Sequence, residues 1–369
     1  MTHVMLGDTC VGAFHMDQLY TLEAAFGLQE VARVLDSLVA IHPSLRSVCS
    51  APAFWINGVG RHRLDETMLA YEDAPLAKRV RRLPLDLALA VFRGRLYRVQ
   101  GVGAVFLGLS IHHLVLDGTS QQIVYSQLSQ LLAATQDKEA LALVPSYDHA
   151  DVAVDAVKEH VRRLTHRPPA ELSEHACSLQ VPALKSTTGV GAAEIIFEHI
   201  PEHGIAAFGD IAASNGYTLN SRLMGALALM LRTHLGQSEL AIQQTYLGRE
   251  PGQLQRVGSH VVGMPIRFCL EGNESLNASC HHVLRETQRH LRGEVDFSGP
   301  VSIGYELNDL RPMPRPESQP QVDFKLVDVF FLVNQYADGY SLMVLYDAGK
   351  YSDEIVEACV VEWLVTAET

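Results

Sequence analysis

The sequence lacks the features that mark secreted, membrane-spanning and metal-bound proteins. Its six cysteines are far apart and form no Cys-x-x-Cys pair, so neither a zinc site nor a dithiol redox centre is indicated. No uncharged apolar run approaches the roughly 18 residues that span a bilayer. The start, Met1-Thr2-His3, has neither the basic residues nor the apolar segment of a signal peptide. We therefore expect a cytoplasmic protein with reduced cysteines and no membrane partner.

Charged residues are scarce as well, and most of those present are acidic. They make up 19% of the chain, below the roughly 25% of an average soluble protein, while hydrophobic residues make up 47%. This composition argues against intrinsic disorder. The net charge is −13, and a surface of that sign repels phosphate backbones, so nucleic acid is not expected as a partner.

The 369 residues are enough for two domains, since a domain takes roughly 100–200 residues. Around residues 166–190 the chain turns polar and irregular, with Pro168-Pro169, Pro182 and Thr187-Thr188-Gly189. This stretch predicts a linker over residues 171–190, between an N-terminal half (1–170) and a C-terminal half (191–369). The strand and helix patterns alternate similarly in both halves. The sequence therefore predicts two sandwich-like halves of the α/β class.

Apolar spacing predicts the main elements of each half. In the first half we expect strands over Tyr20–Phe26, from Arg46 towards Trp55, and over Ala104–His113, with a helix from Leu28 to Pro43 and another capped by Thr119 or Ser120. In the second half we expect strands over Ala192–Glu198, Leu240–Tyr246, Val261–Cys269, Leu326–Val333 and Ser341–Tyr346, and helices over Leu219–Leu235, Asn277–Leu291 and Asp353–Thr366.

The most informative stretch lies at the end of the buried strand near residue 110. His112 and His113 end this strand, and Asp117 and Gly118 follow after three apolar residues. Successive strand side chains point to opposite faces, so one histidine of the pair can enter a cavity while the other packs behind it. A neutral imidazole can accept a proton near neutral pH, which suits a general base. A buried Asp117 needs an arginine or several N–H donors.

This stretch resembles the motif of the HHxxxDG acyltransferases, the superfamily of nonribosomal-peptide condensation domains. Other segments are similar to further motifs of that family, in the same order: His42–Arg46, Leu85–Leu87 with Arg95–Val99, Gly248–Glu250, Val257–Arg267, Asp296–Pro300, and Tyr346–Asp347 with Tyr351–Asp353. The family's opening motif is missing, and the tryptophan after Tyr147-Asp148 is absent. The resemblance therefore indicates a shortened, divergent, stand-alone member.

The resemblance implies a pseudo-dimer of two chloramphenicol-acetyltransferase-like halves with a tunnel at their interface. It makes His113 the catalytic histidine, with His112 and Asp117 holding the motif and Gly118 in the tight backbone beside the reacting thioester. No cofactor would be bound permanently, and no metal is expected. The acyl donor would arrive on the phosphopantetheine arm of an acyl or peptidyl carrier protein acting in trans, or on coenzyme A. The acceptor would be a small molecule or a second carrier-bound unit, and the enzyme a monomer.

The resemblance also singles out residues with two open interpretations. Ser302, Tyr305, Asn308 and Asn334 would bind substrate or an oxyanion, or would be ordinary sheet residues. Arg46 and Arg267 are taken as structural arginines, and one of them is expected to pair with Asp117. Arg249 would brace the structure or contact phosphates, and bracing is favoured. Docking of a carrier would use a basic cluster, either Arg79, Arg81 and Arg82 or Arg162, Arg163 and Arg167.

Three functional interpretations follow. The first is a condensation-type acyltransferase that joins a carrier-bound acyl group to an amine or hydroxyl in natural-product biosynthesis, with an acyl-coenzyme A-dependent enzyme as its variant. The second is a non-catalytic condensation-like docking module, against which the intact His113 and Gly118 argue. The third, epimerisation or cyclisation, has no residue that requires it.

Overall fold

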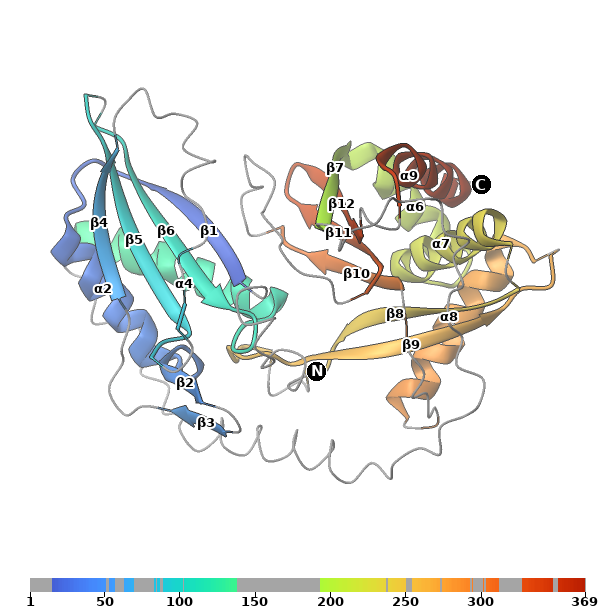
Figure 1. Cartoon of the computed structure of the whole chain (residues 1–369), viewed down its shortest axis with the longest axis horizontal. Coiled ribbons are helices and arrows are strands. Elements are labelled where there is room, and N and C mark those ends of the chain that lie inside the picture. Colours follow the sequence, from blue (N-terminus) through green and yellow to red (C-terminus); the bar gives the residue numbers. More distant parts are fainter. Residues whose placement is uncertain are drawn as a thin grey trace. The chain divides into compact units, whose positions relative to one another are not determined.

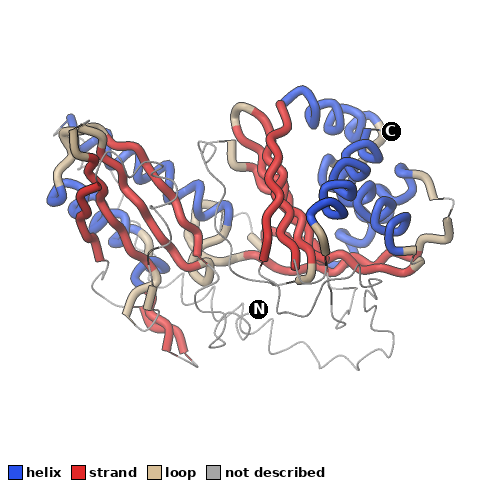
Figure 2. The backbone as a smooth tube through the Cα atoms, turned by 45° about the horizontal axis from the view of Figure 1, so that its top comes forward, coloured by secondary structure: helices blue, strands red, loops and turns tan. Residues whose placement is uncertain are grey.

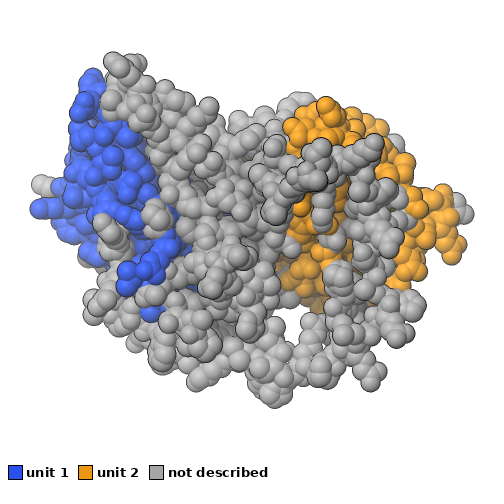
Figure 3. Space-filling model, viewed as in Figure 1, with its two compact units in different colours: residues 1–166, 249–260, 312–321 blue, residues 167–248, 261–311, 322–369 orange. Residues whose placement is uncertain are grey.

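The computed structural model describes residues 15–50, 53–56, 63–69, 83, 85–86, 89–101, 103–137, 193–236, 238–249, 254–272, 274–292, 294, 301, 303–311, 327–347 and 351–368. The expected linker, Ser302 and both basic clusters lie outside these residues. The chain forms two compact units (Figure 3). Unit 1 comprises Met1–His166, Arg249–His260 and Pro312–Gln321, and unit 2 comprises the rest. The expectation of two continuous halves is therefore corrected at Arg249–His260, which belongs with the N-terminal residues.

The sheet of unit 1 has the strand order β1-β6-β5-β4 (Figure 1). Its strands are β1 (His15–Leu22), β4 (Arg63–Leu69), β5 (Phe92–Val99) and β6 (Val105–His112). Only β4 and β5 are parallel to each other. Helices α2 (Leu28–Ile41) and α4 (Gly118–Asp137) contribute to the same apolar core as the sheet. Strand β6 is central, and all its residues except Phe106 are buried, as its apolar sequence predicts.

Local sequence explains how α2 begins and ends. The Glu30 carboxylate accepts the N–H of Gly27 at 2.6 Å, which satisfies one of the donors left unpaired at a helix start. Pro43 ends the helix because it cannot continue the hydrogen-bond ladder. It opens a short 3-10 helix, η1 (Pro43–Arg46), followed by a hairpin of β2 (Ser47–Ser50) and β3 (Ala53–Ile56). The single strand expected from Arg46 towards Trp55 is therefore wrong.

Unit 2 contains a six-stranded mixed sheet with the order β7-β12-β11-β10-β8-β9. Its strands are β7 (Ala193–Pro201), β8 (Glu239–Leu247), β9 (Val261–Cys269), β10 (Ile303–Asp309), β11 (Val329–Tyr336) and β12 (Gly339–Asp347). Its helices are α6 (Glu202–Ser214), α7 (Leu219–Leu235), α8 (Leu276–Leu291) and α9 (Asp353–Glu368). Figure 2 shows the helices of this unit gathered on one face of the sheet, where its largest core lies. No helix in the described ranges is long and apolar enough to cross a membrane.

The edge strand β9 is covered by α8. The Nε2 atoms of His282 and His290 lie 2.6 and 2.7 Å from the backbone carbonyls of Arg267 and Pro265. Carbonyls that would otherwise pair with another strand are thereby engaged by helix side chains, and Pro265 has no N–H to offer.

Candidate active site

The two histidines of the motif have different surroundings. His112 is the last residue of β6 and is fully buried, and its Nδ1 accepts the backbone N–H of Leu114 at 3.1 Å. His113 is the first residue of the turn that follows, and it is half-buried. Its Nδ1 is buried and has no hydrogen-bond partner among the described residues. His112 is thus part of the local structure, and the imidazole of His113 remains available for chemistry.

Asp117 ends this turn and begins helix α4. Its Oδ1 accepts the N–H of Ser120 at 2.8 Å, and its backbone carbonyl accepts the N–H of Gln121 at 2.8 Å. This is the geometry of an N-cap residue, and aspartate is among the best residues for it. The expected cap, Thr119 or Ser120, is therefore wrong, and Gly118 is the first helical residue.

The carboxylate of Asp117 also forms a buried ion pair with Arg249. Arg249 Nη2 lies 2.6 Å from Oδ1, and the two side chains are 1% and 0% exposed. The backbone N–H of His260 donates to Oδ2 at 2.9 Å. Asp117 therefore accepts three strong donors, and a buried carboxylate requires such compensation.

The expected pairing of Asp117 with Arg46 or Arg267 is wrong. Arg267 lies on β9 in unit 2 and pairs with Glu239 at 2.7 Å, where both side chains are well exposed. Arg46 Nη1 donates to the carbonyl of Ala40 at 3.5 Å. Arg249 reaches Asp117 because the chain leaves unit 2 after β8 and runs through unit 1 before β9 begins.

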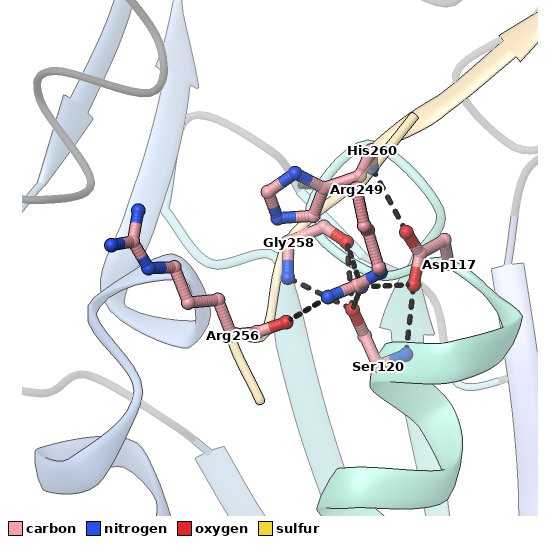
Figure 4. A network of polar contacts seen from close by, with 6 residues as sticks. All are labelled: Asp117, Ser120, Arg249, Arg256, Gly258 and His260. Atoms are coloured by element: carbon pink, nitrogen blue, oxygen red, sulfur yellow. Dashed lines mark hydrogen bonds and ion pairs between the residues drawn. The ribbon is translucent and has the colours of Figure 1, made fainter. Parts of the chain in front are cut away.

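Ser120 completes this network (Figure 4). Its hydroxyl donates to the carbonyl of Gly258 at 2.7 Å and accepts the N–H of Gly258 at 2.9 Å and Arg249 Nη2 at 2.6 Å. A hydroxyl has one donor and two acceptor sites, so that of Ser120 is saturated. Arg249 Nη1 donates to the carbonyl of Arg256 at 2.6 Å. The side chains of Asp117, Ser120 and Arg249 therefore hold the segment 254–260 through its backbone groups.

The network fixes the turn that carries His113 at both ends. Its start is held by the contact of His112 with Leu114, and its end by Asp117 at the start of α4. Preorganised groups of this kind place a reacting side chain without any reorganisation during the reaction. This arrangement can support proton transfer by His113, because the turn that carries His113 is held at both ends.

Two of the candidate substrate-binding residues of unit 2 lie together. Asn308 on β10 and Asn334 on β11 are register partners, and Asn308 Nδ2 donates to Asn334 Oδ1 at 3.2 Å. Tyr305 is instead 0% exposed in the apolar core, edge-on to the ring of Trp363. Its burial raises the pKa of its hydroxyl. The structure therefore corrects the interpretation of Tyr305 as a substrate contact: it is an ordinary core residue.

Sequence reasoning left Ser120 and the backbone of 254–260 out of the site. Ser120 has a usable signal, since it follows Asp117 by three residues and one helical turn brings both to the same face. The contact with Gly258 has no local signal because 138 residues separate the two. In the described part of the chain, no three His, Cys, Asp or Glu side chains gather in a way that would hold a metal ion.

Comparison with known proteins identifies the family. A model described as "Condensation domain" matches residues 8–299, well over half of the chain. The chain belongs to the condensation-domain family. Chondramide synthase cmdD of Chondromyces crocatus is 25% identical over 301 residues, covering 74% of this chain and 7% of that protein. Nonribosomal peptide synthetase 6 of Alternaria brassicicola is 22% identical over 236 residues, covering 60% and 15%. The condensation domain therefore spans only a small part of these relatives.

Solved structures agree with this family assignment at the level of the fold. The epimerization domain from the third module of tyrocidine synthetase B has a TM-score of 0.76 at 14% identity, covering 96% of this chain and 92% of that one. The condensation domain from the Monacolin K polyketide synthase has a TM-score of 0.71 at 12% identity, covering 100% and 94%. The X-domain from teicoplanin biosynthesis, solved in complex with OxyB, has a TM-score of 0.72 at 17% identity, covering 96% and 87%. These likenesses confirm the expected α/β fold class.

Proposed function

We propose that this condensation domain is an acyltransferase that joins a thioester-bound acyl group to an amine or hydroxyl acceptor in natural-product biosynthesis. The observation that carries the proposal is the contrast within the motif. The side chains of His112, Asp117 and Ser120 form hydrogen bonds with backbone groups, while the Nδ1 of His113 has no partner among the described residues. A histidine fixed in place with an unbonded ring nitrogen is suited to proton transfer.

In this mechanism His113 acts on the acceptor. As the acceptor nitrogen or oxygen attacks the thioester carbonyl, the neutral imidazole takes its proton and a tetrahedral intermediate forms. The intermediate collapses when the carbon–sulfur bond breaks, and the imidazolium returns the proton to the departing thiolate. The new bond is an amide or an ester, and His113 ends neutral. Asp117 and Arg249 position the turn and do not touch the reacting atoms.

The acyl donor in this proposal is carried on the phosphopantetheine arm of an acyl or peptidyl carrier protein, with coenzyme A as the alternative carrier. The family match and the synthase and synthetase relatives support a carrier protein. The arm enters as part of the substrate, so no resident cofactor is needed for the proton transfer by His113.

The test is an intact-mass assay of acyl-loaded carrier protein with a panel of amines and alcohols. We expect His113→Ala to lower the rate of acyl transfer about 10²- to 10⁴-fold, the usual contribution of general acid–base catalysis. His234→Ala, a substitution of an exposed histidine on α7, is the matched control and should retain the wild-type rate. Equal rates for the wild type and His113→Ala would exclude His113 as the base. Replacing the carrier by acyl-coenzyme A separates the two donors.

A second candidate is a docking module without catalysis. The observation that favours it is the likeness to an X-domain solved in complex with OxyB. This candidate predicts that the wild type binds a carrier protein or another enzyme and forms no product with any acceptor in the panel. Formation of product that depends on His113 would exclude it.

A further inference from the structure

Helices α8 and α9 of unit 2 both pack against α7, which is buried along most of its length (Figure 1). Each of these two helices turns a second face to solvent. Residues three, four and seven positions apart share one face of a helix, so the exposed residues of each helix can be grouped by their spacing. The two exposed faces differ in charge.

The exposed face of α9 is apolar in its middle and acidic at both ends. We call it the acidic stripe, and its members are Glu354, Glu357, Ala358, Val361, Val365 and Glu368. Val361 and Val365 are 59% and 54% exposed. They lie one helical turn apart, so they form one apolar surface between the carboxylates. Valine is a weaker helix former than alanine or leucine, so helix propensity does not explain the pair, and apolar surface rimmed by charge is typical of a protein–protein contact.

The exposed face of α8 is basic. We call it the basic stripe, and its members are Ala278, His281, Arg285, Gln288, Arg289 and Arg292. Leu291 lies beside it and is 55% exposed. Arg289 and Arg292 have the carboxylates of Glu286 and Glu294 as neighbours, but their side chains remain 48% and 57% exposed. Exposed ion pairs of this kind contribute little to stability, so these arginines can exchange partners at small cost.

The two stripes are complementary to each other. Both helices have 16 residues. In antiparallel packing, the arginines near the end of α8 would meet Glu354 and Glu357 near the start of α9. The side chain of arginine has an apolar stem, which can cover Val361 and Val365 while its charged end reaches a carboxylate. Because both stripes are exposed in one copy of the chain, they do not satisfy each other within that copy.

We propose that these faces form the contact between two copies of the chain, with the acidic stripe of each copy against the basic stripe of the other. Each copy brings both stripes, so the contact forms twice and the assembly closes as a twofold dimer. This assembly differs from the monomer that the family resemblance implies. The inference does not rest on the proposed function, since neither stripe contains a residue of the candidate active site.

Sedimentation equilibrium over about a hundredfold range of protein concentration tests the proposal. We expect a reversible monomer–dimer equilibrium with a dissociation constant in the micromolar range, as contacts of modest area give. Added salt should weaken the dimer, because exposed charges are screened. Non-specific association of a chain with a net charge of −13 is opposed by repulsion, so salt would strengthen it. A monomer at every concentration, or a dimer that salt strengthens, would overturn the proposal.

Charge-reversal variants test the two faces separately. Glu357→Lys with Glu368→Lys makes the acidic stripe basic, and Arg285→Glu with Arg289→Glu makes the basic stripe acidic. Each variant alone brings like charges together, so its dimer should be weakened at least about tenfold. The first variant also makes the whole chain less negative. If general repulsion governed association, this variant would dimerise more tightly than the wild type, which would contradict the proposal.

A mixture of the two variants provides the decisive measurement. Both contacts of a mixed pair join unlike charges again, so the mixture should form dimers with nearly the affinity of the wild type. Recovery in the mixture would also show that both variants are folded. Failure of the mixture to associate, while thermal melting shows both variants folded, would exclude the pairing of the two stripes.

The matched control is Arg33→Glu, which reverses an exposed arginine on α2 in unit 1 and should leave the dimer unchanged. A loss of association in Arg33→Glu equal to that of the stripe variants would show that net charge governs association. All these variants should keep the wild-type rate of acyl transfer. Failure of the proposed function therefore appears in the transfer assay, and failure of this inference appears in the sedimentation measurement.

Discussion

Among the described residues, Arg249 in unit 1 and Arg222 in unit 2 both have buried side chains, and the two have different partners. Arg249 in unit 1 pairs with the Asp117 carboxylate at 2.6 Å. Arg222 on α7 in unit 2 is 1% exposed, and its Nε donates to the carbonyl of Ala367 at 2.7 Å and its Nη1 to the hydroxyl of Tyr217 at 2.9 Å. Its third nitrogen, Nη2, has no partner in the described residues.

This difference in partners indicates different roles: Arg249 positions residues of the candidate site, whereas Arg222 supports the packing of helices in unit 2. Ala367 lies in the last turn of α9, where the backbone carbonyls lack helical partners and the helix dipole places a partial negative charge. A cation such as Arg222 is favourable there without a carboxylate. Arg249 instead holds a full negative charge that also caps α4 and holds His260. We therefore expect breaking the Asp117–Arg249 pair to destabilise the protein more than removing the charge of Arg222.

The largest effect is expected for Asp117→Asn. The substitution keeps the size of the side chain and removes its charge, so Arg249 becomes a buried cation with no counterion. Breaking a buried pair in this way costs about 3–5 kcal/mol in the free energy of unfolding. We also expect slower acyl transfer, because the turn that carries His113 loses its anchor. Chemical denaturation and the intact-mass assay measure the two effects.

The control is the double variant Asp117→Asn with Arg249→Met. Removing both charges leaves neither one uncompensated, so the double variant should be destabilised less than the sum of the two single variants. Additive effects would contradict the charge pair as the reason for the instability. An unchanged free energy of unfolding in Asp117→Asn would contradict it directly.

The sequence predicts the parts of this site that depend on local spacing. The helix Leu219–Leu235 and the strand Val261–Cys269 have the predicted bounds, because their apolar patterns are regular and Gly236 ends the helix in the left-handed conformation. The placement of His112 at the end of a buried strand is confirmed for the same reason. His113, expected in the same strand, is instead the first residue of the turn that follows. The roles of both histidines stay predictions.

The sequence does not predict which arginine meets Asp117. Arg46, Arg249 and Arg267 all lie in segments that resemble family motifs, and spacing along the chain does not distinguish them. The choice depends on the path of 249–260 through unit 1, which is a tertiary property. Tyr305 illustrates the same limit: it alternates with Asn308 along β10, and only the packed helix α9 shows that its face is the core.

A smaller effect is expected for Arg222→Met. The substitution removes a buried charge together with the hydrogen bonds to Ala367 and Tyr217, and a methionine of similar length fills the space. Replacing a buried ionic group by an apolar one is often nearly neutral, and the two acceptors left unsatisfied should cost about 1–3 kcal/mol. Acyl transfer should be unchanged. A loss as large as that of Asp117→Asn, or a specific loss of transfer, would contradict the assignment of Arg222 to helix support.

The smallest effect concerns the reactivity of Cys280, which lies close to Arg222 and Tyr217. Burial raises the pKa of the Cys280 thiol to about 11, and the nearby Arg222 charge lowers it in part. Since the thiolate is the reactive form, iodoacetamide should modify Cys280 far more slowly at pH 8 than the exposed Cys269, and its rate should still rise above pH 9. In Arg222→Met the pKa of Cys280 loses its lowering influence, so the thiol should react more slowly still. Peptide mass spectrometry measures the modification of each cysteine separately. Faster modification of Cys280 in Arg222→Met would contradict this expectation. It would show that the substitution loosens the helix packing, so that Arg222 supports the fold by more than its charge.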